Sequence, residues 1–525
     1  MSEYDVCMVG GGIVSALMAQ HLLAECPHLK IVIVDAGRTH PGLEGRSLRR
    51  QRMLDYGENP WPGDFIPDQL GEGFQSPTMT MGGWALHWSG NVSRFSAEDF
   101  RLHSLYGLAT DWPLTYQDLE PWYCLAERRI GVSGEESPFP EDYRSEPYPM
   151  PGMPLSYSLK QIKTWGEATG IPFVVLPQAK NSIPYDGRAP CLRCDTCHIC
   201  PSGARYSPDF TLQRLVQTGQ VELHDHTLIR RLVLEKNNQR VEKAIGMDER
   251  NGGKSREYRA RVFVIAGGRN WTPPLLLLSA CSRFPDGLAN SSGLVGKYIV
   301  SQDYRIATVE VPHLELYPGM SANIKLATRQ FYRCPPGQPY VRHDLYLEES
   351  EVQPPRLRDD GGQLLLGDTL MARWREDNRL PRIKVGIPLD IHPVEHSRVI
   401  LDSSRKNRWG DPLPKVSIVA DRAPDPRRVD TNAYVDQLLG RFVTAGGGRV
   451  VGPVEKRLTH FGGGCRMGDD PHTSVCNSYG QTHDHDNLYT VGAASLPTGG
   501  CAAPTLTYVA LALRSVERIK EQLRP

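Results

Sequence analysis

The chain opens with Tyr4-Asp5-Val6-Cys7-Met8-Val9, an apolar run that leads into the glycine turn Gly10-Gly11-Gly12. Apolar residues at helical spacing follow as far as Leu23, and a second apolar run, Ile31 to Val34, ends at Asp35. Strand, glycine turn, helix, strand and acid, in that order, make up the βαβ unit that binds a dinucleotide. The stretch therefore predicts an α/β fold with a Rossmann-like domain built on a parallel sheet.

Four residues of this unit are predicted to contact or shape the dinucleotide site. Gly10 permits the tight turn, and Gly12 lets a pyrophosphate approach the helix N-terminus, where unpaired N–H groups favour anions. Ser15 stands where a third glycine is commoner and is small enough for close helix–strand packing. Asp35 lies where a carboxylate would bind the ribose. A plain glycine-rich turn of an α/β protein is the alternative interpretation.

Length and charge limit the classes of protein to which the chain can belong. Its 525 residues predict two to four domains. Lys plus Arg and Asp plus Glu both number 60, so no basic excess points to nucleic acid. No apolar run approaches the roughly 18 residues of a membrane span. The first predicted strand starts at Tyr4 and leaves no room for a signal peptide, which predicts a cytoplasmic chain by its own sequence.

Different kinds of sequence pattern follow one another along the rest of the chain. Residues 36–77 are irregular and polar and predict an excursion over the surface, while Met81 to Gly90 is rich in glycine and tryptophan. There Gly82 and Gly83 would let backbone pass close to a ligand. Helices are predicted over 114–131 with Thr115 as N-cap, from Pro273 through Leu278, near 426–445 and over Thr505 to Leu523. Strands are predicted over Val221–His224, Leu228–Leu234, Arg261–Ala266, Ile306–Val311, Arg382–Ile391 and Leu488–Gly492.

These sequence patterns predict a dinucleotide-binding domain into which a second domain is inserted. The strand that ends at Ala266 runs into glycines and suits an edge that faces the cofactor. The alternating, proline-punctuated strands between about 303 and 450 predict an antiparallel sheet. We expect residues 1–100, 205–302 and 455–525 to form the cofactor domain. Residues 101–204 and 303–454 would form the substrate domain and covering segments, with a cysteine-rich loop at 191–201.

That loop carries four thiols at intervals of three residues: Cys191, Cys194, Cys197 and Cys200, followed by Pro201. Three residues fall about 60° short of a full helical turn, so the four thiols can converge only on a loop that wraps around a centre. Thiolates gathered in this way suit an iron–sulfur cluster or zinc. The spacing resembles the ferredoxin run, although its last interval differs. Zinc, free thiols and disulfides remain alternatives; the other eight cysteines are scattered, which predicts reduced thiols.

The far end of the chain carries a candidate base and a candidate helix start. His460 precedes the glycines Gly462 to Gly464, and Pro504-Thr505 begins the last predicted helix. A histidine beside a flavin can take the proton of an alcohol while the adjacent C–H leaves as hydride. A helix start aimed at the cofactor would polarise a flavin carbonyl or a developing anion. A structural role for His460 is the alternative.

Taken together, the N-terminal unit, Gly82 to Trp88, His460 with its glycines, and Pro504 to Thr507 resemble the glucose–methanol–choline (GMC) flavoprotein oxidoreductases. The likeness extends to the large FAD subunit of bacterial fructose, glucose and gluconate dehydrogenases. It covers most of the chain and is weakest at 310–450, where substrate specificity would be encoded.

The resemblance implies FAD at Gly10, Gly12 and Asp35, and a proton acceptor at His460. His87 matches the histidine that some relatives bond covalently to the flavin, whereas other relatives bind FAD without a bond. Ser89 falls where relatives place a hydroxyl group near the reactive flavin nitrogen. The cysteine run matches a loop that holds a three-iron cluster, and its four cysteines leave both 3Fe-4S and 4Fe-4S open.

One position departs from the family. Where relatives have Asn or His immediately before this helix start, the chain has Ala503, which cannot hydrogen-bond a substrate hydroxyl. Three hypotheses follow. The first is a dehydrogenase of a sugar, glycoside or polyol hydroxyl that passes electrons through an iron–sulfur cluster to an acceptor protein or quinone. The second is a catalytically silent subunit or a non-redox, lyase-like relative that uses flavin structurally, and the third is a flavin enzyme with structural zinc. The resemblance also implies a small accessory subunit and a cytochrome, and a periplasmic location only if the chain is exported together with a partner.

Overall fold

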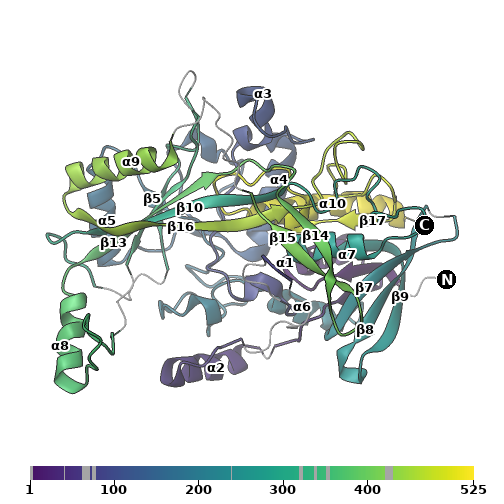
Figure 1. Cartoon of the computed structure of the whole chain (residues 1–525), viewed down its shortest axis with the longest axis horizontal. Helices are drawn as coiled ribbons and strands as arrows, with labels where there is room; N and C mark the ends of the chain where they lie inside the picture. The colour runs from purple at the N-terminus through teal and green to yellow at the C-terminus, as the bar shows by residue number, and fades with distance from the viewer. Residues whose placement is uncertain are drawn as a thin grey trace.

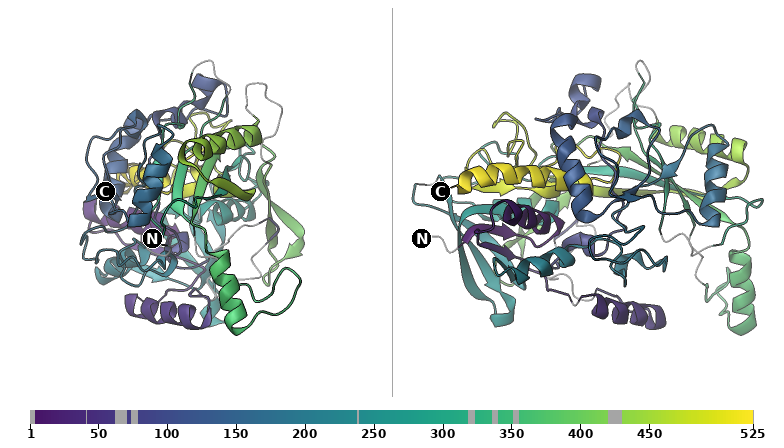
Figure 2. Two further views of the ribbon diagram at one scale, coloured as in Figure 1. Left: turned by 90° about the vertical axis from the view of Figure 1, so that its left-hand side faces the viewer. Right: turned by 180° about the vertical axis from the view of Figure 1, so that it is seen from behind.

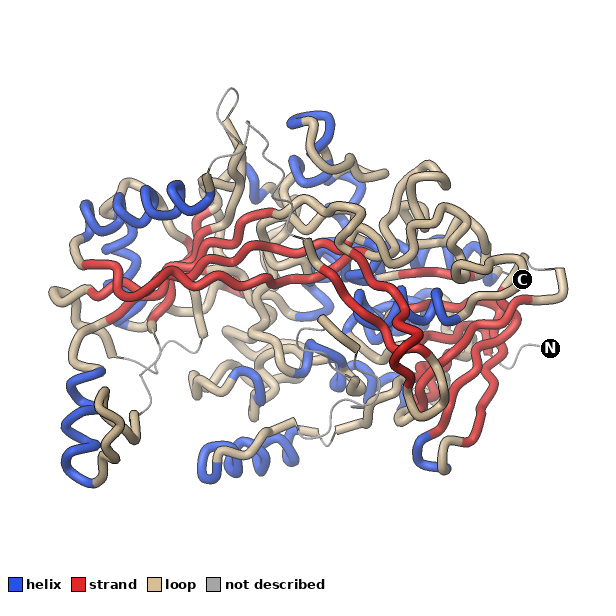
Figure 3. The backbone as a smooth tube through the Cα atoms, viewed as in Figure 1, coloured by secondary structure: helices blue, strands red, loops and turns tan. Residues whose placement is uncertain are grey.

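The computed structural model describes residues 4–40, 42–61, 71–73, 79–237, 239–317, 323–335, 340–350, 355–419 and 430–524. Two large sheets dominate it, one near the chain termini and one at the opposite end of the molecule (Figure 1; Figure 3). Within the described part of the chain, no helix is both long and apolar enough to cross a membrane.

The sheet near the termini is built around the opening strand. Its order is β6 (Val221–His224), β2 (Ile31–Val34), β1 (Tyr4–Val9), β9 (Lys254–Ile265), β8 (Val241–Asp248) and β7 (Thr227–Leu234), and β17 (Leu488–Thr490) also pairs with β9. The pairs among β6, β2, β1, β9 and β17 are parallel, whereas β7, β8 and β9 pair antiparallel. The parallel part is the dinucleotide-binding type of sheet that the opening sequence predicts.

Both faces of this parallel sheet are covered, as its continuous apolar strands require. Alternate residues such as Val6 and Met8 pack into one core with α1 (Ile13–Glu25), α4 (Tyr116–Ile130), α6 (Pro208–Gln217) and α10 (Thr505–Leu523). The intervening Cys7 packs on the other side with β7, β8 and α7 (Gly268–Leu278). The N-terminal glycine turn therefore lies between two cores.

The second sheet is antiparallel and has the order β16 (Arg449–Gly463), β10 (Ile299–Glu310), β13 (Arg382–Asp390), β12 (Leu345–Glu349), β11 (Leu326–Thr328) and β5 (Val174–Val175). Alternate apolar residues of β10, β12 and β13 pack with α5 (Tyr157–Glu167) and α9 (Thr431–Gly446). The long strands β10 and β16 extend from these helices toward the first sheet (Figure 1; Figure 2). Gln302 and Tyr304, between the core positions of β10, belong to the opposite face.

Smaller elements complete the chain. They are α2 (Leu43–Tyr56), the 3₁₀ turn η2 (Gly83–Leu86), α3 (Leu102–Tyr106), the strand pair β3 (Ser133–Gly134) and β4 (Met150–Pro151), the 3₁₀ turn η5 (Cys197–Ile199), α8 (Gly367–Asp377), and the hairpin of β14 (Arg398–Lys406) and β15 (Pro412–Ser417).

The predicted α/β class and the two kinds of sheet are confirmed. Thr115 caps α4 by accepting a hydrogen bond from the N–H of Asp118, and α10 has the predicted bounds. The helix predicted near 426–445 is α9, while residues 421–429 lie outside the described residues.

Two local predictions are wrong. The excursion at 36–77, expected to be irregular, contains the helix α2. This helix has no apolar stripe, because its one buried side chain is Arg46, which pairs with Asp209. Residues 62–70 and 74–78 of the excursion lie outside the described residues. Helix α7 begins at Gly268, directly after β9, and not at the prolines. Pro273 and Pro274 instead lie inside it and remove two helical N–H donors.

Candidate active site

Two glycine turns from separate segments meet at the carboxyl end of the parallel strands. Gly10 has a φ of 100°, and a Cβ there would lie 2.8 Å from the carbonyl oxygen of Ala266, so both backbone angle and space demand glycine. The N–H of Gly82 donates to the carbonyl oxygen of Gly11 at 2.8 Å. A Cβ on Gly83 would lie 3.5 Å from the Cα of Gly12. The structure thus brings Gly10, Gly12, Gly82, Gly83 and Ala266 to one place.

Gly12 differs from its neighbours because a Cβ there would meet no atom within 4 Å. It is the N-cap of α1, and no side chain caps this helix. The Oγ of Ser15 donates to the carbonyl oxygen of Gly10 at 2.5 Å. The two carboxylate oxygens of Asp35 accept the N–H groups of Gly11 and Gly37, each at 2.7 Å, and burial raises the pKa of this carboxyl group. Free N–H groups beside open space suit a pyrophosphate.

A buried arginine, Arg269, follows strand β9 at this edge of the sheet. Arg269 is 5 % exposed, and its Nη1 has no hydrogen-bond partner among the described residues. Its guanidinium lies 4.2 Å from the ring centre of Phe461, and burial lowers its pKa to about 10. An unpaired buried cation fits an anionic group. The open space at Gly12, the uncapped helix and this orphan donor together fit the phosphates of FAD.

His460 lies at the end of β16 with a left-handed φ of 53°, a strained angle for a residue with a side chain. Its residue surface is exposed to water, yet burial, together with the positive charge of Lys325, lowers its pKa to about 4. Both observations hold for a ring that water reaches from one side while protein surrounds it on the others. The imidazole is therefore neutral at physiological pH, the form that can accept a proton.

The ring of His460 is joined to the last loop before α10. Its Nδ1 lies 2.6 Å from Oε1 of Gln302, whose Nε2 donates to the carbonyl oxygens of Gly499, Gly500 and Ala502. Pro504 is the N-cap of α10, and no side chain caps that helix either; Oγ1 of Thr505 accepts from the hydroxyl of Tyr508 at 3.2 Å.

His87 ends the 3₁₀ turn η2 among aromatic rings. Its ring centre lies 5.2 Å from that of Trp61 and 5.8 Å from that of Trp84. Trp88 donates from its indole N–H to the carbonyl oxygen of Tyr206 at 2.9 Å, and Ser89 follows half-buried. The histidine and serine thus follow directly on the turn that contacts Gly11 and Gly12.

The four thiols lie on one loop, but within the described residues no three His, Cys, Asp or Glu side chains converge closely enough to hold a metal ion. The expected cage is therefore not assembled in this structure. Left-handed angles at Arg193 and Asp195 turn the loop so that its thiols meet different neighbours. Cys194 contacts Thr196 at 3.2 Å, and the ammonium group of Lys180 donates to Cys197 at 3.4 Å.

The surroundings of these sulfurs are nevertheless rich in donors. The N–H of Arg193 donates to Cys191, and the N–H of Arg205 donates to Cys200, each at 3.5 Å. Burial raises the pKa of Cys191 and of Cys197. Burial also acts to raise that of Cys200, but the N–H and charge of Arg205 outweigh it and hold the pKa below its usual value. Donors and cations around sulfur suit thiolate ligands.

Arg205 also joins the cysteine loop to the turn that precedes His87. Its fully buried guanidinium donates to the carbonyl oxygens of Cys197 at 2.7 Å, Ala85 at 2.9 Å and Leu86 at 2.7 Å. Trp61 makes a second connection, because its indole N–H donates to the carbonyl oxygen of His198 and its ring contacts His87.

Three residues of the site were missed from the sequence. Gln302 and Lys325 lie on strands whose alternation reveals a face but not which side chain reaches His460. Arg269 carried a signal, since an arginine directly after Gly267-Gly268 at a strand end is unusual for a buried turn. The cofactor, catalytic and metal roles assigned to the sequence-predicted residues stay predictions.

The model of the GMC oxidoreductase family matches residues 393–512. The fructose dehydrogenase large subunit of Gluconobacter japonicus is 28 % identical over 550 residues, which cover 99 % of this chain and 98 % of that protein. The chain is thus similar to GMC oxidoreductases over nearly its whole length, and residues 393–512 match the family itself.

Two further enzymes and one solved structure are also similar to this chain. The 6'''-hydroxyparomomycin C oxidase of Streptomyces lividus is 29 % identical, covering 99 % of this chain and 92 % of that protein. The 2-methyl-1,2-propanediol dehydrogenase of Mycolicibacterium austroafricanum is 28 % identical, covering 86 % and 82 %. Pyridoxine 4-oxidase from Mesorbium loti shares the fold, with a TM-score of 0.64, 16 % identity and 99 % of both chains covered. The resemblance noted from the sequence is confirmed, and the GMC similarity implies an oxidoreductase that uses FAD and acts on alcohol groups.

Proposed function

We propose that this GMC oxidoreductase is a dehydrogenase that oxidises a hydroxyl group of a sugar, glycoside or polyol. The observation that carries the proposal is His460, a neutral and water-accessible imidazole on the strand that approaches the dinucleotide edge. The substrate class comes from relatives whose names specify fructose, a propanediol and an aminoglycoside. FAD, when bound, supplies the hydride acceptor for the carbon that bears the hydroxyl.

The chain's own residues supply the other half of the chemistry. His460 takes the proton of the substrate hydroxyl, because its lowered pKa keeps a lone pair available. The α1 N-terminus at Gly12 and the guanidinium of Arg269 hold the negative charge of the cofactor. Gln302 donates to the loop that leads into α10. The N-terminus of α10, which begins where this loop ends, carries a partial positive charge that stabilises negative charge nearby.

Replacing the base tests the proposal. His460→Asn should slow anaerobic flavin reduction by a panel of sugars and polyols about 10²- to 10⁴-fold, while flavin content stays unchanged. His485→Asn is a matched control, since burial lowers the pKa of His485 too but its Nδ1 contacts the carbonyl oxygen of Gln239 instead. Equal rates in the two variants, or no flavin bleaching in the wild type with any donor, would argue against the dehydrogenase.

Ala503 supports a second candidate, a catalytically silent GMC subunit. The side chain is 8 % exposed and cannot hydrogen-bond a hydroxyl group. Under the dehydrogenase proposal, Ala503→Asn should accelerate flavin reduction. A wild type that no donor reduces, together with no gain from Ala503→Asn, would favour the silent subunit.

We further propose that the loop carrying Cys191, Cys194, Cys197 and Cys200 holds an iron–sulfur cluster that passes electrons to an external protein or quinone. N–H donors to sulfur and the buried cations Lys180 and Arg205 suit thiolates around a metal centre, and the ferredoxin-like spacing favours a cluster over zinc. Metal and acid-labile sulfide analysis of anaerobically prepared protein decides it: iron with sulfide supports the cluster, and zinc alone supports a structural staple.

An accessory subunit and a cytochrome complete the proposal, since the fructose dehydrogenase relative is named as a large subunit. Purification from the native host with intact complexes should reveal these partners. Whether FAD is bonded to His87 can be read from the same material, because covalent flavin stays with the protein after acid denaturation.

A further inference from the structure

The side-chain amide of Gln302 has only one possible orientation. Gln302 is fully buried, and its Nε2 lies 3.0, 3.0 and 2.7 Å from the carbonyl oxygens of Gly499, Gly500 and Ala502. A carbonyl oxygen can only accept a hydrogen bond, so the amide atom that faces all three must be the NH₂ donor. The flip that usually leaves amide oxygen and nitrogen interchangeable is therefore excluded here by three backbone acceptors.

The orientation of the amide determines the state of the histidine ring. With Nε2 directed at the loop, Oε1 is the atom that lies 2.6 Å from Nδ1 of His460. An amide oxygen cannot donate, so the hydrogen of this contact belongs to Nδ1. A neutral imidazole carries one proton, which leaves the lone pair on Nε2.

We propose that Gln302 is a positioning residue that holds His460 as the Nδ1–H tautomer, so that Nε2 is the atom that accepts the substrate proton. The use of Nε2 in catalysis rests on the proposed function, whereas the tautomer does not. In the transfer, the O–H bond of the substrate breaks and an Nε2–H bond forms. The imidazolium that results keeps its Nδ1–H bond to Gln302.

The same amide joins the base to the loop just before Ala503. Gln302 and His460 lie on adjacent strands, β10 and β16, and residues 499–502 lead directly into α10. The base is thereby oriented from the backbone of this loop, with no polar side chain at position 503. Its other polar surroundings are Oγ1 of Thr459, 3.5 Å from Nδ1, and the charge of Lys325, which pairs with Glu348 at 2.8 Å.

Nitrogen-15 NMR of histidine-labelled protein tests the tautomer without any turnover. The resonances missing from His460→Asn identify the ring, and the wild type should show a protonated Nδ1 and an unprotonated Nε2 at neutral pH. Gln302→Leu should shift this ring toward the Nε2–H tautomer. Gln178→Leu is the matched control, because Gln178 is another fully buried glutamine but donates to Asn91 and Asn323. An unchanged His460 signature in Gln302→Leu would overturn the proposal.

A second variant separates positioning from a loss of stability. In Gln302→Glu the oxygen that replaces Nε2 faces the same three carbonyl oxygens, so this buried carboxyl group keeps its proton and donates it to the loop. Its other oxygen still accepts from Nδ1–H, so Gln302→Glu should keep the Nδ1–H tautomer that Gln302→Leu loses. Gln302→Leu should lower the rate of flavin reduction about 10- to 100-fold, and Gln302→Glu should lower it less. If Gln302→Leu and Gln302→Glu show the same tautomer and the same rate, the proposal is wrong. If His460→Asn retains the wild-type rate, only the proposed function fails.

Discussion

At the scale of single residues, glycines that look alike in the sequence have different physical roles. Gly10 needs glycine for the protein itself, since its φ is 100° and a Cβ would lie 2.8 Å from Ala266. Gly12 has an ordinary φ of −81° and no atom within 4 Å of a Cβ position. Its missing side chain therefore leaves room for something outside the polypeptide.

This difference gives a prediction that separates folding from cofactor binding. Gly12→Val should keep the melting temperature of the cofactor-free protein near that of the wild type, but FAD content should fall to nearly none. Gly10→Ala should instead lower the stability of the cofactor-free protein, because the strained φ and the close contact both act on the fold. Thermal melts and the flavin absorbance of purified protein measure both. Normal FAD content in Gly12→Val would refute the assignment of this turn.

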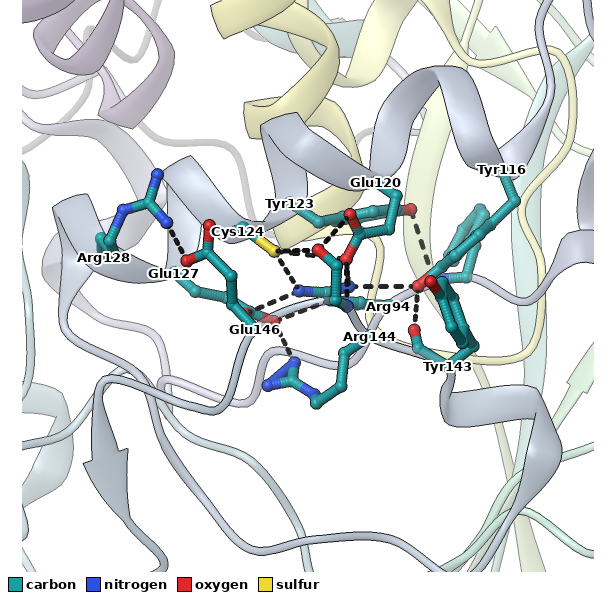
Figure 4. Close-up of polar contacts among 12 residues, drawn as sticks. Arg94, Tyr116, Glu120, Tyr123, Cys124, Glu127, Arg128, Tyr143, Arg144 and Glu146 are labelled. Carbon is teal, nitrogen blue, oxygen red and sulfur yellow. Dashed lines mark hydrogen bonds and ion pairs between the residues drawn. The ribbon is translucent and has the colours of Figure 1, made fainter.

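At the scale of elements, a buried ion network holds α4 against the segment that follows Ser89. Arg94 pairs with Glu120 at 2.8 Å and with Glu127 at 2.9 Å, and all three side chains are at most 7 % exposed. Figure 4 shows them converging, with Arg144 also reaching Glu127. Arg128 and Glu146 form a second pair nearby, but both of their side chains are nearly half exposed.

Removing the buried cation should therefore cost far more than removing the exposed one. Arg94→Met leaves buried Glu120 without its ion pair and Glu127 with Arg144 alone, and should lower the free energy of unfolding by about 3–5 kcal/mol. Arg128→Met, on the helix that carries both glutamates, should lower it by less than about 1 kcal/mol. Urea unfolding followed by tryptophan fluorescence measures both, and equal losses would contradict the role given to burial.

The second sheet holds a histidine whose titration affects stability. His343 is fully buried, its Nε2 lies 2.8 Å from the hydroxyl of Tyr434, and burial lowers its pKa to about 4 from 6.5. Between pH 6.5 and 4 the unfolded chain binds the proton and the folded protein does not, so this group's stabilisation falls as pH falls. Asp344, whose pKa is raised to about 7 by burial, acts in the opposite direction.

A comparison with His343→Gln isolates the histidine from Asp344. The stability difference between wild type and variant should shrink by about 3 kcal/mol as pH falls from 7 to 4, which corresponds to the separation of the two pKa values. Urea midpoints at several pH values give this difference directly. A difference that does not vary with pH would show that His343 titrates as it does in the unfolded chain.

At the scale of the whole molecule, one arginine connects the two proposed redox regions. Arg205 joins the carbonyl oxygen of Cys197 to those of Ala85 and Leu86, about 120 residues away in the sequence. The turn next to the dinucleotide edge and the cysteine loop are thereby joined by hydrogen bonds from one side chain. Such an arrangement suits electron transfer from flavin to an external acceptor.

Cys197→Ser should separate the two half-reactions. Flavin reduction by substrate should keep its wild-type rate, whereas transfer to a protein-sized one-electron acceptor should slow at least tenfold, because the proposed cluster loses a ligand. Cys281→Ser, at a half-buried thiol outside the loop, provides the control. Stopped-flow measurements of reduction and reoxidation resolve the steps. Unaltered reoxidation in Cys197→Ser would leave the loop a structural role only.

The sequence by itself determined the features that depend on local order: the βαβ unit, the capped helix α4, the helix α10 and the antiparallel character of the 303–450 region. Periodicity and turn chemistry act over a few residues and can be recognised in a single chain. Helix α2 escaped because a buried ion pair, not an apolar stripe, anchors it.

Only the tertiary structure decided which distant residues share the site. Gln302 contacts His460, which is 158 residues away in the sequence, and Gly82 contacts Gly11, which is 71 residues away. No local sequence pattern encodes contacts at such separations. Such contacts arise from strand register and from the packing of one segment on another. Register places every second side chain on the same face, but which of them reaches the histidine depends on the register shift opposite Val300 and Gln302, where β16 has one extra residue between Thr459 and Gly462.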